Sequence, residues 1–232
     1  MSQEERSEAF IDVLADLERS PIDFVLVGGY AVSQFETRFS TDLDLVIASE
    51  DTDAVVTFLE EQNFERKNDL EVPPEETIYN REIELFERTT GLPHPIGVDL
   101  LVNGLGCRQT EAEWSFDYLR DHCSETTISG GTRSMTASVA DGEVLVAAKL
   151  HSGRKTDLAD VLAAVPHINF LPTVASHLHR GDEDALHSQL RAAQEFIEDG
   201  GLDHRFKSMF GQSSASADDM EALLEFLDEQ QQ

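Results

Sequence analysis

The chain has 232 residues, of which 46 are acidic and 17 are Lys or Arg, so its formal net charge is −29. Such a charge alone is typical of disordered chains, but 40% of the residues are hydrophobic and recur at regular spacings, which predicts a folded protein of one large or two small domains. The sequence does not open with a basic segment followed by an apolar one, as a signal peptide does. Its longest apolar runs, such as VLVAA at 144–148, are too short to span about 30 Å of hydrocarbon. We therefore expect a soluble, cytoplasmic protein without membrane contact.

The acidic residues are spread over the whole chain, whereas lysine occurs only four times. This composition resembles that of proteins from halophilic archaea, because in molar salt the Debye length falls to about 3 Å and self-repulsion is screened. We therefore interpret the charge as an adaptation to habitat. The alternative interpretation is an acidic surface that mimics or repels nucleic acid.

The first part of the chain predicts alternating helices and strands. Apolar residues at helical spacing predict helices over 4–19, 30–36 and 51–62. Apolar or alternating runs predict strands over 22–27, 43–48, 77–87 and 95–102. The β-α-β order favours a mixed sheet, and Gly28-Gly29 marks the turn between the first strand and its helix.

From Ser138 onward the pattern changes to amphipathic helices. We therefore predict an α+β protein with two parts: a core over 1–136, with a small mixed β-sheet flanked by helices, and an all-helical part over 137–232. The stretch GQSSASADD at 211–219 predicts a flexible linker before a last helix.

Two carboxylates, Asp42 and Asp44, lie at the start of the second predicted strand. Because side chains on a strand alternate between faces, both point to one side, about 6–7 Å apart. Like charges at this distance repel, so a bound cation is the simplest explanation for keeping both. Asp99 is a third acid, in a run where Val, Leu or Ile would be expected.

Magnesium suits such a site, since it takes one or two carboxylates and completes its shell with waters and substrate phosphates. The Gly28-Gly29 turn allows a close backbone approach and leaves N–H groups for phosphate oxygens. These residues together predict a nucleoside triphosphate as substrate, with Mg²⁺ or Mn²⁺ as cofactor.

Three motifs in this order resemble the polymerase-beta-like nucleotidyltransferase superfamily: VLVGG at 25–29, DLDLV at 42–46 and VDLLV at 98–102. Two longer stretches narrow the resemblance to the AbiEii-type toxin nucleotidyltransferases and their uncharacterised relatives: RFSTDLDLVI at 38–47 and VLVAAKLHSGRKTDLADVLAAV at 144–165. The resemblance covers about residues 22–165.

The resemblance implies a nucleotidyltransferase fold and a role for each acid: Asp42 and Asp44 bridge two metal ions, and Asp99 binds the catalytic metal and helps to deprotonate the acceptor hydroxyl. The alternative is that Asp42 caps a turn and Asp44 pairs with Arg38. Arg38 is expected to offset charge on the triphosphate or the pyrophosphate, although a structural salt bridge explains it nearly as well.

Lys149 lies on an apolar helix face, which is costly unless its ammonium reaches a phosphate or a carboxylate. It is the candidate nucleotide contact outside the core. Arg154 and Asp157 either position that helix or form a helix-junction ion pair. Cys107 and Cys123 have neither zinc-ligand nor disulfide-framework spacing.

The prediction is thus a metal-dependent enzyme that transfers a nucleoside monophosphate to an RNA or protein acceptor, tRNA among them. By resemblance it is the toxin of a toxin–antitoxin pair with a cognate antitoxin as partner. One alternative is a non-catalytic nucleotide-binding or antitoxin-like partner protein of the same fold. Another is a D-x-D glycosyltransferase, which leaves Gly28-Gly29 and Asp99 unexplained.

Overall fold

A computed structural model of the protein describes residues 3–38, 40–67, 83–89, 95–130, 132–168, 172–211 and 215–231. Its strands form one larger and one smaller sheet. Among the described residues the larger sheet has seven strands, in chain order β1 (Phe24–Val27), β2 (Asp42–Ile47), β3 (Glu65–Arg66), β4 (Ile83–Arg88), β5 (Ile96–Val102), β8 (Cys123–Gly130) and β9 (Arg133–Ala140). The smaller sheet pairs β6 (Gly104–Cys107) with β7 (Ala112–Ser115).

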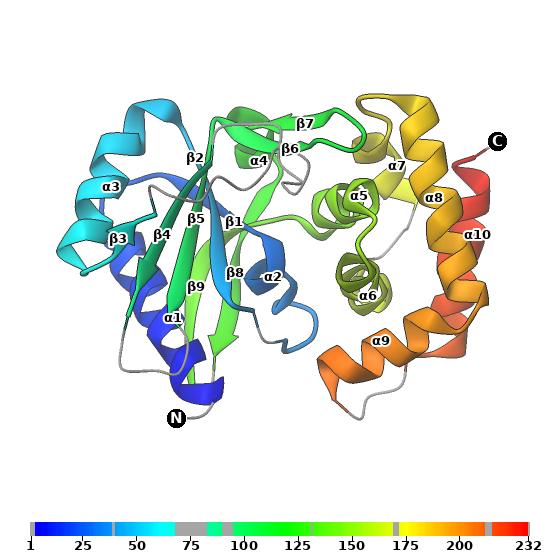
Figure 1. Cartoon of the computed structure of the whole chain (residues 1–232), viewed down its shortest axis with the longest axis horizontal. Helices are drawn as coiled ribbons and strands as arrows, with labels where there is room; N and C mark the ends of the chain where they lie inside the picture. The colour runs from blue at the N-terminus through cyan, green and yellow to red at the C-terminus, as the bar shows by residue number, and fades with distance from the viewer. Residues whose placement is uncertain are drawn as a thin grey trace. The chain divides into compact units, whose positions relative to one another are not determined.

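The larger sheet is mixed, and its strand order is β3-β4-β5-β2-β1-β9-β8 (Figure 1). β2 runs parallel to β5 and β1 parallel to β9, whereas β1 and β2, β4 and β5, and β8 and β9 are antiparallel pairs. The central strands β1, β2 and β5 are mostly buried, which agrees with their continuous apolar runs. The predicted α+β architecture with a mixed sheet is confirmed.

Helices flank this sheet. They are α1 (Gln3–Glu18), α2 (Gly28–Val32), α3 (Thr52–Glu61), which continues a 3₁₀ turn at Ser49–Asp51, and α4 (Phe116–Asp121). Figure 1 shows α1 along the sheet, where it contacts β9, β8 and β5. Gly130 on β8 allows this approach, because a Cβ there would lie 2.8 Å from the carbonyl oxygen of Ser7.

Some predicted boundaries differ from those observed. The helix predicted over 30–36 begins earlier, at Gly28, and ends at Val32. The strand predicted over 77–87 is observed as β4 from Ile83, and residues 77–82 lie outside the described ranges. The pair β8 and β9 was not predicted, since β8 is largely exposed and has little apolar periodicity.

The carboxy-terminal part is helical. Its α-helices are α5 (Gly142–Ser152), α6 (Lys155–Ala164), α7 (Pro172–Leu178), α8 (Glu183–Glu198), α9 (Gly201–Phe210) and α10 (Ala217–Glu229). α5 contacts α6, α7 and α8, and α8 contacts α9 and α10. Within the predicted linker, α10 begins at Ala217, where the Ser216 hydroxyl caps it, while residues 212–214 are not described.

The chain folds into two compact units, one of residues 1–105 with 114–140 and the other of residues 106–113 with 141–232. The boundary predicted near residue 136 falls inside β9, four residues before this division. Residues 138–140 are therefore strand and not helix, because Ser138 still pairs with Glu125 of β8. In the described part of the chain, no helix is long and apolar enough to cross a membrane.

Candidate active site

The parallel pairing of β2 with β5 brings the three predicted acids to one face of the sheet. Asp44 lies directly opposite Asp99 in the strand register, and Asp42 lies opposite Gly97. Neighbouring strands are about 4.8 Å apart, and residues two apart on a strand share a face. Asp42, Asp44 and Asp99 therefore form three corners of a small patch, as the sequence predicts.

Two glycines leave the space that these carboxylates occupy. Gly28 has a φ of +67°, and a Cβ there would lie 1.9 Å from Oδ2 of Asp44. A Cβ on Gly97 would lie 2.3 Å from Oδ1 of Asp42. Side chains at 28 and 97 would thus collide with the acids, and the predicted glycine turn does lie against Asp44.

The second glycine of the turn faces two polar groups. A Cβ on Gly29 would lie 2.4 Å from Oγ of Ser40 and 3.1 Å from Nη2 of Arg38. The guanidinium of Arg38 therefore reaches the turn, next to the strand that carries the acids. The position of Arg38 at the glycine turn is compatible with the predicted contact between its guanidinium and a phosphate, and that contact stays a prediction.

The surroundings of Asp99 change its acidity. Burial raises the pKa of Asp99 to about 8, and the negative charges of Asp44, Asp42 and Glu87 add to this effect. Glu87 is a fourth carboxylate on the same face, since it pairs with Gly97 across β4 and β5. It also forms an ion pair with Lys67.

The donor set suits a hard divalent cation, because it consists of carboxylate oxygens beside a glycine turn. Within the described ranges, however, no group of three or more His, Cys, Asp or Glu side chains is arranged to hold a metal ion. The Oδ2 of Asp42 accepts a hydrogen bond from Oγ1 of Thr41 at 2.5 Å. Mutual repulsion between the carboxylates opposes their close approach unless a positive charge lies between them.

We expect Asp99→Asn to stabilise the metal-free protein increasingly as pH rises from 5 to 8. The folded state raises the pKa of Asp99 above its unfolded value, so this carboxyl stabilises the fold most at low pH and loses that contribution as pH approaches about 8. Asn carries no such charge. Because Asp99 is only partly buried, we expect a gain of about 1–3 kcal/mol at pH 8, or a few degrees in the melting temperature.

Thermal unfolding of both proteins in chelator and molar KCl measures this difference. Mg²⁺ should stabilise the wild type at pH 8 and leave Asp99→Asn unchanged. A difference between the two proteins that does not vary with pH would contradict the assignment.

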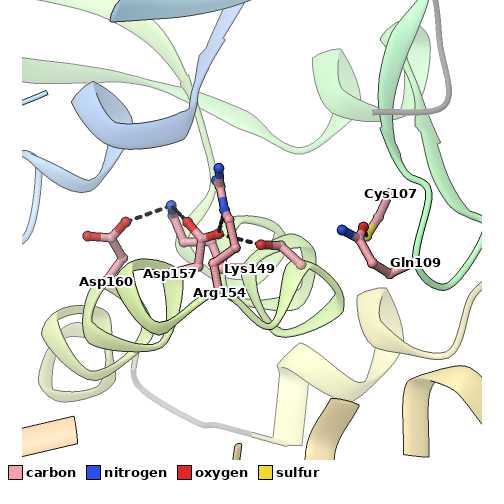
Figure 2. Close-up of polar contacts among 7 residues, drawn as sticks. Cys107, Gln109, Lys149, Arg154, Asp157 and Asp160 are labelled. Atoms are coloured by element: carbon pink, nitrogen blue, oxygen red, sulfur yellow. Dashed lines mark hydrogen bonds and ion pairs between the residues drawn. The ribbon is translucent and has the colours of Figure 1, made fainter. Parts of the chain in front are cut away.

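Lys149 lies in the helical unit and is buried between two carboxylates of α6. Figure 2 shows its Nζ, which is 2.9 Å from Oδ1 of Asp157 and 2.7 Å from Oδ2 of Asp160. Nε of Arg154 donates to Oδ2 of Asp157 at 2.6 Å, and the Ser152 hydroxyl donates to the same oxygen. The sequence predicts that the ammonium of Lys149 reaches either a phosphate or a carboxylate, and in the structure it contacts two carboxylates. The contact of Lys149 with a nucleotide stays a prediction.

The charges of this cluster keep Asp157 ionised. Burial alone would raise the pKa of Asp157, but the charges of Lys149 and Arg154 and the hydrogen bonds from Arg154 and Ser152 outweigh it and hold the pKa below its usual value. Asp157 therefore stays ionised, and the cluster ties α5 to α6. The helix-junction alternative for Arg154 and Asp157 agrees with these contacts.

His151 is a packing residue of the same unit. Its Nε2 lies 2.6 Å from the carbonyl oxygen of Leu178, which can only accept, so Nε2 carries the proton. Its Nδ1 is 2.7 Å from Oγ1 of Thr110, and burial lowers the pKa of His151. The neutral ring thus joins α5, which carries it, to Thr110 and to the end of α7 at Leu178.

Both cysteines are free thiols, and Sγ of Cys107 lies 3.2 Å from Oε1 of Gln109 (Figure 2).

Sequence reasoning missed several residues around the site. Glu87 and Gly97 lie beside the acids, Ser40 lies against the Gly29 turn, and Arg6 bonds to the carbonyl of Thr41 next to Asp42. Gly97 carries a local signal, because glycine inside an apolar strand indicates a close approach by another group. Arg6 and Glu87 carry none, because only strand order and helix packing bring them to the site.

Comparison of the sequence with models of protein families gives no match, and comparison with curated proteins gives none. Among solved structures, the chain is similar to a candidate nucleotidyltransferase from H. pylori, with a TM-score of 0.52, 14% identity and coverage of 100% of this chain and 96% of that one. It is equally similar to JHP933 from Helicobacter pylori, with a TM-score of 0.52, 15% identity and coverage of 100% and 93%.

A structure of ANT(2")-Ia in complex with adenylyl-2"-tobramycin has a TM-score of 0.42 and 14% identity, with coverage of 97% of this chain and 98% of that one. At these identities, the two Helicobacter structures support a shared fold. The chain therefore has the nucleotidyltransferase fold that its sequence motifs predict.

Proposed function

We propose that this chain is a metal-dependent nucleotidyltransferase that transfers a nucleoside monophosphate from a nucleoside triphosphate to a hydroxyl of an RNA or protein acceptor. One observation carries the proposal: Asp44 lies opposite Asp99 in parallel register, with Asp42 on the same face and the Gly28 turn against Asp44. Three carboxylates that share a face beside a glycine turn suit a metal-bound triphosphate.

The proposed step is a displacement at the α-phosphorus. The acceptor oxygen bonds to that phosphorus while the bond to the oxygen that bridges to the β-phosphate breaks, and pyrophosphate leaves with the bonding electrons. The proton of the acceptor passes to Asp99. A cation held beside Asp99 would keep this carboxyl ionised, because a positive charge lowers the pKa of a neighbouring carboxylate, and an ionised carboxylate can accept the proton.

Asp42, Asp44 and Asp99 would hold the Mg²⁺ or Mn²⁺, which offsets the charge that develops on the phosphates. The backbone at Gly28 and Gly29 would receive phosphate oxygens. The nearby guanidinium of Arg38 would bind the triphosphate or the departing pyrophosphate, for which its planar fork is suited.

The proposed acceptor and cellular role rest on the resemblance of sequence motifs. A toxin of the AbiEii type with a cognate antitoxin is supported by RFSTDLDLVI and by the helix that carries Lys149, and a halophilic archaeal origin is supported by the acidic composition. A tRNA acceptor would require local basic residues on a chain whose net charge is −29, since phosphate binding depends on Lys and Arg.

The test is a labelling experiment in molar KCl with Mg²⁺. Each common nucleoside triphosphate, labelled at the α-phosphate, is incubated with the protein and with total RNA or total protein. We expect label to enter one acceptor class, together with release of pyrophosphate. Binding of nucleotide without transfer to either class would favour the non-catalytic partner protein. In a parallel reaction with nucleoside-diphosphate sugars, release of nucleoside diphosphate with transfer of the sugar would favour glycosyl transfer.

A further inference from the structure

Arg6 is a buried cation of α1 whose hydrogen bonds reach two distant segments. The residue is only 9% exposed. Its Nη2 donates to the carbonyl oxygen of Thr41 at 2.9 Å and to that of Pro95 at 2.7 Å. A buried guanidinium is costly unless acceptors surround it, so these two carbonyls stabilise Arg6 in this position.

The two carbonyls occupy equivalent places in the sheet. Thr41 immediately precedes Asp42, the first residue of β2, and Pro95 immediately precedes the first residue of β5. A single nitrogen of Arg6 therefore bridges the entries of the two strands that carry Asp42, Asp44 and Asp99. The planar guanidinium can donate along fixed directions to two acceptors, which an ammonium does with less geometric control.

The ladder between β2 and β5 is weak at this end. The amide nitrogen of Gly97 lies 3.4 Å from the carbonyl oxygen of Thr41, which is longer than the usual 2.7–3.2 Å. Pro95 has no N–H to contribute, and Gly97 has no side chain to pack. The bonds from Arg6 therefore support the pairing at a point where a hydrogen bond between the strands is long.

The strand register matters because it decides which side chains face one another. A slip of one residue would turn Asp99 to the opposite face from Asp44. The carbonyl oxygen of Thr41, which accepts from Arg6, belongs to the residue next to Asp42, so the guanidinium lies at the start of the strand that carries Asp42 and Asp44.

We propose that Arg6 is a positioning residue that holds the entries of β2 and β5 in register, so that Asp42 and Asp44 face Asp99. Its catalytic consequence rests on the proposed function. Its structural consequence does not, because the register can be measured without metal or nucleotide.

The test compares Arg6→Gln and Arg6→Lys with a control, Arg19→Gln, which alters an exposed arginine just after the same helix that pairs with Asp16. Amide hydrogen exchange is followed at Gly97, with Thr127 in the β8–β9 ladder as internal reference. Affinity for Mn²⁺ alone is measured in parallel.

We expect Arg6→Gln to speed exchange at Gly97 about tenfold relative to Thr127 and to weaken Mn²⁺ binding about tenfold. Arg6→Lys should lie between Arg6→Gln and the wild type, and Arg19→Gln should match the wild type. If Arg6→Gln does not fold, the exchange rate at Gly97 in Arg6→Lys, relative to Thr127, tests the proposal. Unchanged exchange at Gly97, or an equal rise at Gly97 and Thr127, would overturn the proposal. A wild type that does not bind Mn²⁺ would count against the proposed function, and the exchange data would still test Arg6.

Discussion

Asp44→Asn is expected to lower nucleotidyl transfer by about a thousandfold or more, which corresponds to about 4 kcal/mol of transition-state stabilisation. Asp44 is the central acid of the patch, opposite Asp99 and against Gly28. The amide keeps the shape of the side chain but loses the charge that a metal-bound triphosphate requires. Label transfer to the acceptor, measured in molar KCl with Mg²⁺, gives the loss directly.

The same substitution should leave the fold intact or slightly stabilise it, because it relieves repulsion between Asp44 and its neighbours. Thermal unfolding in chelator checks this. Asp53→Asn is the matched control, since it removes an exposed acid from α3 and should leave both activity and stability unchanged. Full turnover by Asp44→Asn would exclude the proposed mechanism.

Lys149→Met is expected to have the largest effect on stability, a loss of about 3–5 kcal/mol. The substitution keeps much of the side-chain volume but leaves the buried carboxylates of Asp157 and Asp160 without the ammonium between them. The melting temperature should fall by roughly 10 °C. Lys207→Met is the control, because Lys207 pairs with Asp203 at the surface of α9 and its loss should change stability by at most about 0.5 kcal/mol.

A second variant separates stability from nucleotide binding. Adding Asp157→Asn and Asp160→Asn to Lys149→Met removes the stranded charges and should recover part of the lost stability. If the recovered protein binds nucleoside triphosphate as the wild type does, Lys149 holds α5 to α6 and does not contact phosphate. Weaker nucleotide binding by this protein would support the predicted contact.

Local sequence patterns predicted those features whose cause is local. The helix α1 and the strands β1, β2 and β5 follow from apolar residues at regular spacing, and burial confirms them. The β8–β9 hairpin has no comparable signal, because most side chains of β8 face solvent and are polar. β8 is a strand because it pairs with β9, and a pattern within one segment does not reveal its pairing with another segment.

The sequence by itself determined that Asp42 and Asp44 share a face, because alternation along a strand is a property of the backbone. It also marked Asp99 and Lys149 as polar groups in apolar settings, which require a partner. Only the tertiary structure decided which partner each one has. The parallel register sets Asp99 opposite Asp44, the packing of α5 against α6 gives Lys149 two carboxylates, and the packing of α1 brings Arg6 to strand entries 35 and 89 residues away. Contacts across such separations depend on how whole elements pack, and spacing along the chain does not encode them.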